Sequence, residues 1–279
     1  RKFVNLAAGS ALFALAGYPA FGKGADAVSL IDTPEKRQEY TRRLLKKLCN
    51  DIGPRPSGSK GFAKGAEIIR KEMKLSLPQV HFDPYKFEKW ELNEEAEFIV
   101  GGQRIEAIPA AGGIGTSLEG IHGVLQKSKN GFSLIDPLTK DIRANITVGS
   151  FGKGTTRSAL RRDQAPLPSF SIGKQDVPLL ENAERDKVPA WTKFVVRYTP
   201  DAEGFNIVGR LPGKQKKEIL ILAHADTVYN TPGGNDNTAS VIVMLMLAHA
   251  AAARANNHSI TFVATGNEEF GMLGANNYA

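Results

Sequence analysis

Three groups of polar residues each lie beside a strongly apolar run in the C-terminal part of the chain. His224 and Asp226 directly follow the apolar run EILILA. Asp236 stands between two asparagines before a long helical pattern, and Glu268 and Glu269 follow the apolar run SITFVAT. One imidazole and several carboxylates are ligand types that bind zinc in proteins. If the three groups meet in the folded chain, they could hold a metal ion and activate a water molecule.

The apolar runs predict the elements that would bring these groups together. Residues 218–223 and 259–265 are short and continuously apolar, as strands buried on both faces are, and residues 236–253 have the length and periodicity of a helix. The order strand, helix, strand indicates parallel strands joined by a right-handed crossover. Ligands of open parallel sheets bind at the carboxyl ends of the strands. Each polar group alone has an ordinary structural explanation, so the expected convergence at one edge is what favours a metal site.

The same residues resemble a known family. The segments 224–226 (HAD), 233–237 (GGNDN) and 268–271 (EEFG) are similar, in order and spacing, to the motifs of the dizinc aminopeptidases. That family includes the secreted bacterial leucine aminopeptidases, aminopeptidase Y and glutamate carboxypeptidase. Residues 51–58 (DIGPRPSG) resemble its N-terminal segment, and residues 168–183 resemble part of the protease-associated domain that some members insert. The resemblance implies the zinc exopeptidase fold, a mixed, mostly parallel α/β sheet flanked by helices, with an inserted small β-rich domain.

The resemblance also implies a role for each polar residue. His224 and Glu269 would each ligate one zinc ion, and Asp236 would bridge two zinc ions with its two carboxylate oxygens. Glu268 would be the general base, and Asp226 would orient the imidazole of His224. The peptide bond that follows Asp236 would be cis. The implied cofactor is zinc, two ions in a complete site, and the implied reaction is hydrolysis of a peptide by a metal-activated water.

A complete site of this family has five protein ligands, of which the chain contains three. The missing aspartate and histidine follow the glutamate pair at a distance that lies beyond Ala279. His249 does not replace them, because it lies about 20 Å along the predicted helix from Asp236. His258 is at the opposite end of the strand that leads to the glutamates, and nothing places the two earlier histidines near the site. We therefore expect a sequence truncated at its C-terminus, with the 279-residue chain itself inactive.

The predicted organisation has four parts. Residues 1–27 have the order of a secretory signal peptide, with two basic residues, an apolar run and small residues, and cleavage is expected near Ala27. We therefore expect export to the periplasm or to the outside of the cell. Residues 28–117 are predicted to form the N-terminal part of the peptidase domain. Residues 118–203 are predicted to form the protease-associated-like insertion, and residues 204–279 the zinc-binding core.

The composition excludes some classes of partner. The chain is 42% hydrophobic and 23% charged, which suits a globular protein with a sizeable core. Its net charge of +7 is scattered, and aromatic residues are not interleaved with the basic ones, so no nucleic-acid partner is expected. The glycines and proline of the leader argue against a stable membrane span. The single cysteine, Cys49, excludes an intrachain disulfide and a cysteine-based zinc site. The oligomeric state is left open.

The leading interpretation is a secreted zinc exopeptidase, most of all an aminopeptidase, with peptides as substrates. Enzymes similar to acetylornithine deacetylase also have a His-x-Asp after a strand, but their bridging aspartate follows in a different glycine-rich context. Glutaminyl cyclase, a one-zinc transferase, is an alternative within the same fold. A non-catalytic binding protein that retains the fold is the alternative from a different functional class, and the missing ligands favour it for the chain as it stands.

Overall fold

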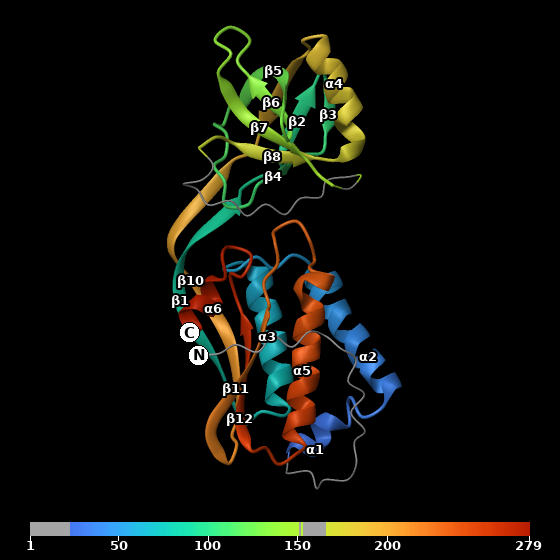
Figure 1. Ribbon diagram of the computed structural model, residues 1–279, viewed down its shortest axis with the longest axis vertical. Helices are drawn as coiled ribbons and strands as arrows, with labels where there is room; N and C mark the ends of the chain where they lie inside the picture. The colour runs from blue at the N-terminus through green and yellow to red at the C-terminus, as the bar shows by residue number, and fades with distance from the viewer. Residues whose placement is uncertain (1–22, 151, 153–165) are drawn as a thin grey trace.

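The computed structural model describes residues 23–150, 152 and 166–279, which fold into two parts connected by two long strands (Figure 1). The helices and helical turns are α1 (Lys23–Val28), α2 (Pro34–Leu45), η1 (Lys46–Ile52), α3 (Lys60–Lys74), η3 (Lys174–Asp176), α4 (Val177–Arg185), η4 (Gly234–Thr238), α5 (Ala239–Ala252) and α6 (Leu273–Tyr278). The strands are β1 (Gln79–Leu92), β2 (Glu97–Val100), β3 (Gln103–Ile105), β4 (Ile108–Pro109), β5 (Ile121–Ser128), β6 (Gly131–Ile135), β7 (Ile142–Val148), β8 (Ser169–Ile172), β9 (Pro189–Lys193), β10 (Val196–Leu211), β11 (Gln215–His224) and β12 (His258–Thr265).

The first part is a mixed α/β unit whose sheet has the strand order β1-β10-β12-β11. β11 and β12 are parallel, with His224 opposite Thr265 at their carboxyl ends, as the sequence predicted. β10 pairs antiparallel with both β1 and β12. The predicted mixed sheet is therefore confirmed, but it has one parallel pair among the described strands rather than mostly parallel pairs. The strand-helix-strand pattern identified the parallel pair, whereas nothing in β1 or β10 indicated their direction.

The second part is a β-rich module with the strand order β3-β2-β9-β5-β6-β7-β8-β4 and the helix α4. The predicted boundary at residue 118 is wrong for this sheet, because β2, β3 and β4 belong to it. β10 also runs without a break through the predicted boundary at residue 203. Alternation of apolar and polar residues identifies a short strand but not the sheet that it joins, since β2 pairs with β9, which is far away along the chain. The protease-associated identity of the module stays a prediction.

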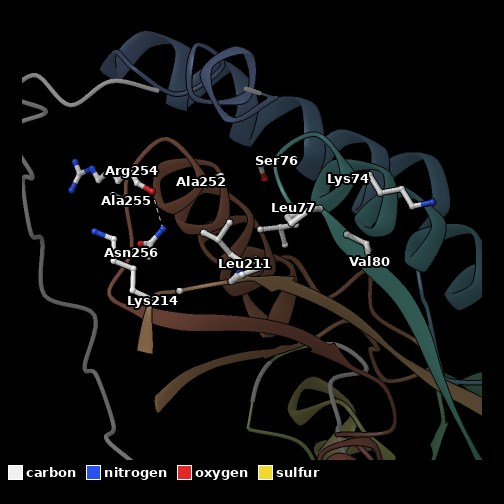
Figure 2. Close-up of a pocket in the computed structure, with 13 residues that line it drawn as sticks. Lys74, Ser76, Leu77, Val80, Leu211, Lys214, Ala252, Arg254, Ala255 and Asn256 are labelled. Carbon is white, nitrogen blue, oxygen red and sulfur yellow. Dashed lines mark hydrogen bonds between the residues drawn. The ribbon is translucent and has the colours of Figure 1, made fainter. Parts of the chain in front are cut away.

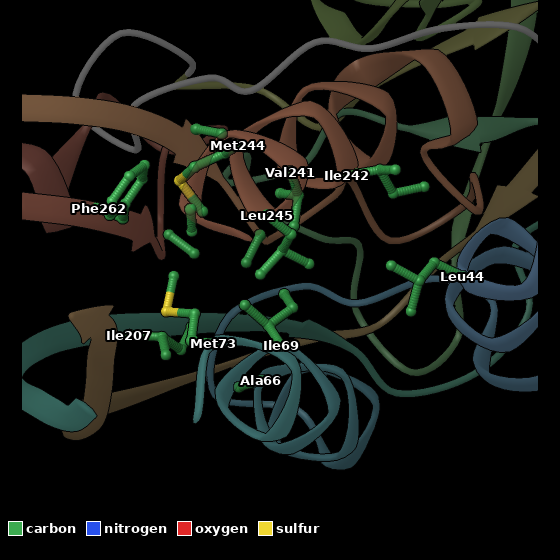
Figure 3. Close-up of a cluster of buried hydrophobic side chains, with 14 of the residues drawn as sticks. Leu44, Ala66, Ile69, Met73, Ile207, Val241, Ile242, Met244, Leu245 and Phe262 are labelled. Carbon is green, nitrogen blue, oxygen red and sulfur yellow. The ribbon is translucent and has the colours of Figure 1, made fainter. Parts of the chain in front are cut away.

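The hydrophobic core of the first part lies between the sheet and the helices α2, α3 and α5 (Figure 3). Ile69 and Met73 from α3 point toward Leu245 and Met244 of α5, with Phe262 of β12 beside them. Apolar residues occur all round α5, and one side of the helix is buried in this cluster. This packing fixes the axis of α5, and therefore the turn at its N-terminus that carries Asp236.

The N-terminal helix α1 lies within the predicted signal peptide, which stays a prediction. Residues before Val28 were expected to be removed with the signal peptide, yet Ala27 is 2% exposed and α1 contacts α5. A small side chain suits this close contact as well as it suits a cleavage site, so the sequence pattern alone does not distinguish the two. The rest of the predicted signal peptide, residues 1–22, lies outside the described residues. Within the described ranges, no helix combines the length and apolarity that crossing a membrane requires.

His249 on α5 is fully buried in this core, far from the carboxyl ends of the strands. Its Nδ1 lies 2.9 Å from the hydroxyl of Ser76, and its Nε2 lies 3.0 Å from the hydroxyl of Tyr40. Burial lowers the pKa of His249 to about 4, against a smaller opposing effect of the Glu72 charge. The imidazole is therefore a neutral core group at physiological pH, which agrees with its exclusion as a metal ligand.

We predict that His249 makes the protein less stable in acid. Its folded pKa of about 4 lies below its unfolded value of about 6.5. The contribution of neutral His249 to the free energy of unfolding is therefore fully present above about pH 6.5. As the pH falls toward 4, the free energy of unfolding decreases by roughly 3 kcal/mol. Denaturant unfolding at pH 7 and pH 4 measures the change. The variant His249→Gln keeps polar atoms without an imidazole and should lose about 3 kcal/mol less over this range. Equal losses in parent and variant would contradict the prediction.

Candidate metal centre

The first segment of the site is the end of β11. His224 is the last residue of the strand and is buried. Its Nδ1 lies 3.1 Å from the backbone carbonyl oxygen of Asp226, and its Nε2 lies 3.0 Å from Oδ1 of Asp236. A proton on Nδ1 that is donated to the carbonyl leaves the Nε2 lone pair of the neutral imidazole directed into the site. That is the tautomer a metal ligand needs.

The second segment is the glycine-rich turn before α5. Gly233 has φ +63°, and a side chain there would collide with Thr227, so only glycine fits. Asp236 has φ −117° and ψ 92°, and regular helix begins at Ala239, which is later than the predicted start at Asp236. The peptide bond between Asp236 and Asn237 is cis, as the family resemblance implied. The non-helical turn places the carboxylate beside the imidazole instead of in the first turn of the helix.

The third segment follows β12 and is held by Asp226. The carboxylate of Asp226 is 1% exposed and accepts the backbone N–H of Glu268 at 3.1 Å and that of Glu269 at 3.4 Å, one on each oxygen. Its Oδ1 lies 3.6 Å from Nδ1 of His224. Nδ1 of His224 is therefore closer to the backbone carbonyl of Asp226 than to its carboxylate, and the orienting role of Asp226 stays a prediction. The carboxylate instead joins the glutamate turn to the end of β11.

The three segments bring His224, Asp236 and Glu269 together. One ligand atom from each lies within 4.8 Å of the others, as a shared metal ion requires. Glu268 is not in this group, although its Oε2 lies 3.7 Å from Nε2 of His224. Among the described residues, no other histidine belongs to the group. The group therefore includes Glu269 and not Glu268, and the roles of the two glutamates stay a prediction.

The electrostatics of the group fit a cation. Burial lowers the pKa of His224, but the carboxylates of Asp226 and Glu268 outweigh burial and raise it to about 9. Burial, followed by the charges of Asp236 and Asp226, raises the pKa of Glu269 to about 7. Several carboxylates in one partly buried place repel one another. A divalent cation would relieve that repulsion, so the donor set and its electrostatics both suit a metal ion.

One large cavity lies away from this site. It has a volume of about 840 Å³ and lies where α3 and α5 end, lined among others by Lys74, Lys214 and Arg254 (Figure 2). The candidate ligands are at the opposite, N-terminal end of α5, a helix about 20 Å long. A smaller cavity of about 370 Å³ includes Ser57 in its lining, and the hydroxyl of Ser57 accepts the backbone N–H of Asn267 at 2.7 Å. One residue that lines this cavity is therefore hydrogen-bonded to the turn that carries the glutamates.

Sequence reasoning missed the residues that hold the segments in place. Arg55, Thr227 and Thr238 are buried, and Arg55 donates hydrogen bonds to the hydroxyls of both threonines. The sequence places Arg55 in the motif DIGPRPSG and predicts no role for it. An arginine between two prolines, in a motif that resembles the family's N-terminal segment, was the available signal.

Comparison with known proteins supports this assignment. The model of peptidase family M28 matches residues 206–279, the segment that contains all three candidate ligands. Aminopeptidase YwaD from Bacillus subtilis is 25% identical over 269 residues, which cover 87% of this chain and 57% of the relative. Human carboxypeptidase Q is 30% identical over 74% of this chain and 53% of the relative. The chain thus spans somewhat more than half the length of these relatives.

Solved structures agree on the fold. A zinc aminopeptidase from Bacillus subtilis has a TM-score of 0.67 at 23% identity, over 86% of this chain and 64% of that one. A peptidase M28 precursor from Shewanella amazonensis has a TM-score of 0.72 at 15% identity, over 92% of this chain and 69% of that one. The family model thus assigns residues 206–279 to peptidase family M28, and the solved structures show the shared fold over most of the chain.

Proposed function

We propose that this protein is a zinc-dependent exopeptidase, most of all an aminopeptidase, that removes terminal residues from peptides. The observation that carries the proposal is the meeting of His224, Asp236 and Glu269 at one edge of the sheet, with Glu268 beside them. The names of the homologues, aminopeptidase and carboxypeptidase, support peptide hydrolysis as the reaction. Export of the protein is proposed from the leader pattern alone.

His224, Asp236 and Glu269 are the residues proposed to hold zinc. In such a site bound zinc polarises the carbonyl of the scissile bond and lowers the pKa of a water molecule. The aspartate has two carboxylate oxygens and could contact two ions, as in a dizinc centre. An imidazole nitrogen and carboxylate oxygens form a donor set that zinc commonly takes in catalytic sites.

Glu268 is proposed as the general base. Its side chain is about one-third exposed and lies next to His224 without joining the ligand group, so it can face an attacking water. A carboxylate in this position takes the proton of the water and passes it to the leaving amine. Asp226 fixes the backbone of Glu268 and Glu269 and therefore directs the two side chains to different tasks.

The end of the peptide from which a residue is removed distinguishes two candidate activities. The match to aminopeptidase YwaD favours hydrolysis at the N-terminus of the peptide. The match to carboxypeptidase Q makes hydrolysis at the C-terminus the second candidate. Peptides with a free N-terminus and a blocked C-terminus, and the reverse, distinguish the two when products are followed by mass spectrometry. Release from neither type would contradict the exopeptidase proposal.

We predict that Glu268→Gln and Glu269→Gln affect different properties. In protein expressed from the complete reading frame, Glu268→Gln should lower kcat by about 10²- to 10⁴-fold, because it removes the proposed base, and should retain zinc. Glu269→Gln should lower the zinc content. Aminoacyl-nitroanilide hydrolysis and elemental analysis measure the two effects. Glu203→Gln, an exposed glutamate on the connecting strand β10, is the control and should change neither.

The contradicting outcome is an exchange of the two effects. If Glu268→Gln loses the metal and Glu269→Gln keeps it, the proposed roles of the glutamates are reversed. If the parent contains zinc and cleaves no peptide, the exopeptidase function is wrong although the metal site is correct.

We predict that Asp226→Asn destabilises the site more than a matched change elsewhere. Asp226 uses both oxygens to accept two backbone N–H groups, so an amide would direct one NH₂ toward a donor, at a cost of about 1–3 kcal/mol. Asp136 in the β-rich module also accepts two backbone N–H groups, but both on Oδ1, which asparagine retains. Its Oδ2 pairs with the exposed Arg143, and losing such a surface ion pair costs at most about 1 kcal/mol. Denaturant unfolding should therefore show a larger loss for Asp226→Asn than for Asp136→Asn. Equal losses would contradict the anchoring role.

A further inference from the structure

Arg55 is a buried cation that does not form an ion pair within the described part of the chain. The residue is 2% exposed, in the loop between η1 and α3. Its guanidinium donates to three backbone carbonyl oxygens through Nη1: that of Leu48 at 2.7 Å, that of Gly53 at 2.9 Å and that of Pro232 at 3.1 Å. Burying an arginine in this way is costly unless its donors are satisfied, and here carbonyl groups satisfy them.

The remaining bonds of Arg55 reach the segments that carry the candidate ligands. Nε lies 3.4 Å from the carbonyl oxygen of Ala225, the residue between His224 and Asp226. Nη2 lies 2.6 Å from the hydroxyl of Thr238, two residues after Asp236. Together with the bond to Pro232, the guanidinium links the end of β11 to both sides of the glycine-rich turn.

The backbone of the same loop continues this connection. The N–H of Arg55 donates to the hydroxyl of Thr227 at 2.8 Å, and its carbonyl accepts the N–H of Thr227 at 3.2 Å. Two residues further on, Ser57 accepts the N–H of Asn267, which precedes the glutamates. The loop 55–57 is therefore bonded to all three ligand-bearing segments.

The helix beside this loop leaves room for the side chain. A Cβ at Gly65 of α3 would lie 2.7 Å from Cδ of Arg55, closer than carbon atoms pack. The space is thus shaped for the arginine stem. A lysine would place a single ammonium group where the guanidinium has a planar set of five N–H donors, so it could not serve all of these acceptors.

We propose that Arg55 is a positioning residue that sets the separation of His224 and Asp236 and thereby the geometry in which they hold zinc. The inference rests on the proposed function, because it presupposes zinc at this site. Arg55 contacts no candidate ligand side chain and acts through backbone carbonyls and Thr238. Its replacement should therefore change metal affinity and coordination geometry without removing a ligand.

The test compares zinc binding by the 279-residue chain and its variants, by competition with a chromophoric chelator. Arg55→Lys should weaken zinc binding by about 10- to 100-fold, the usual range for residues that support metal ligands. Thr238→Val removes one acceptor while keeping the shape, and should weaken binding by roughly threefold to tenfold. Arg43→Lys is the control, because Arg43 makes a similar paired contact, with Glu72, away from the site. It should leave the zinc affinity unchanged.

Two further readouts separate positioning from a general loss of stability. The visible absorption spectrum of the cobalt-substituted protein should change in Arg55→Lys and not in Arg43→Lys, since it reports coordination geometry. An Arg55→Lys protein that folds and has the zinc affinity and cobalt spectrum of the parent would overturn the proposal. If Arg55→Lys does not fold, Thr238→Val decides, and unchanged affinity in that variant would overturn it.

A separate measurement distinguishes this inference from the proposed function. If the parent chain binds no zinc, the metal assignment fails, and amide hydrogen exchange of the chelator-treated protein then tests Arg55 alone. Faster exchange across residues 224–238 in Arg55→Lys, and not in Arg43→Lys, would support the positioning of the ligand loop. Unchanged exchange in that segment would overturn it.

Discussion

The parallel register of β11 with β12 is the constraint on which the rest of the site depends. It sets His224 opposite Thr265, so that both strands end at one edge and their following residues are neighbours. The core beneath, from Ile69 and Met73 to Leu245, fixes α5 across this pair and brings the turn with Asp236 to the same edge. A shift of the register by one residue would turn the imidazole to the other face of the sheet and separate it from the carboxylates.

Hydrogen bonds from buried polar groups then fix the positions of the three ligand-bearing segments relative to one another. Asp226 holds the glutamate turn through two backbone N–H groups, and Arg55 holds the glycine-rich turn and the end of β11 through carbonyl groups. The two residues have opposite charges and complementary tasks, since one satisfies donors and the other satisfies acceptors. Buried polar groups are costly when left without partners, so such a network favours one arrangement of the loops.

The candidate site could be predicted from sequence to the extent that it depends on local patterns. The apolar runs located β11 and β12, and the family resemblance named His224, Asp236 and Glu269 as candidate ligands. The start of α5 at Ala239, the antiparallel direction of β10 and the place of β2 in the second sheet could not be predicted, because each depends on a partner far away in the sequence. Arg55 was missed for the same reason. Its role is visible only once five separate acceptors surround it.

The central claim is that three ligand-bearing segments form one metal site. Diffraction from zinc-soaked crystals, recorded above and below the zinc absorption edge, tests it most directly. The account predicts an anomalous peak within bonding distance of Nε2 of His224 and of carboxylate oxygens of Asp236 and Glu269, with Glu268 beside the peak and not bonded to it. Zinc bound only at other residues, or no peak between these three side chains, would contradict it.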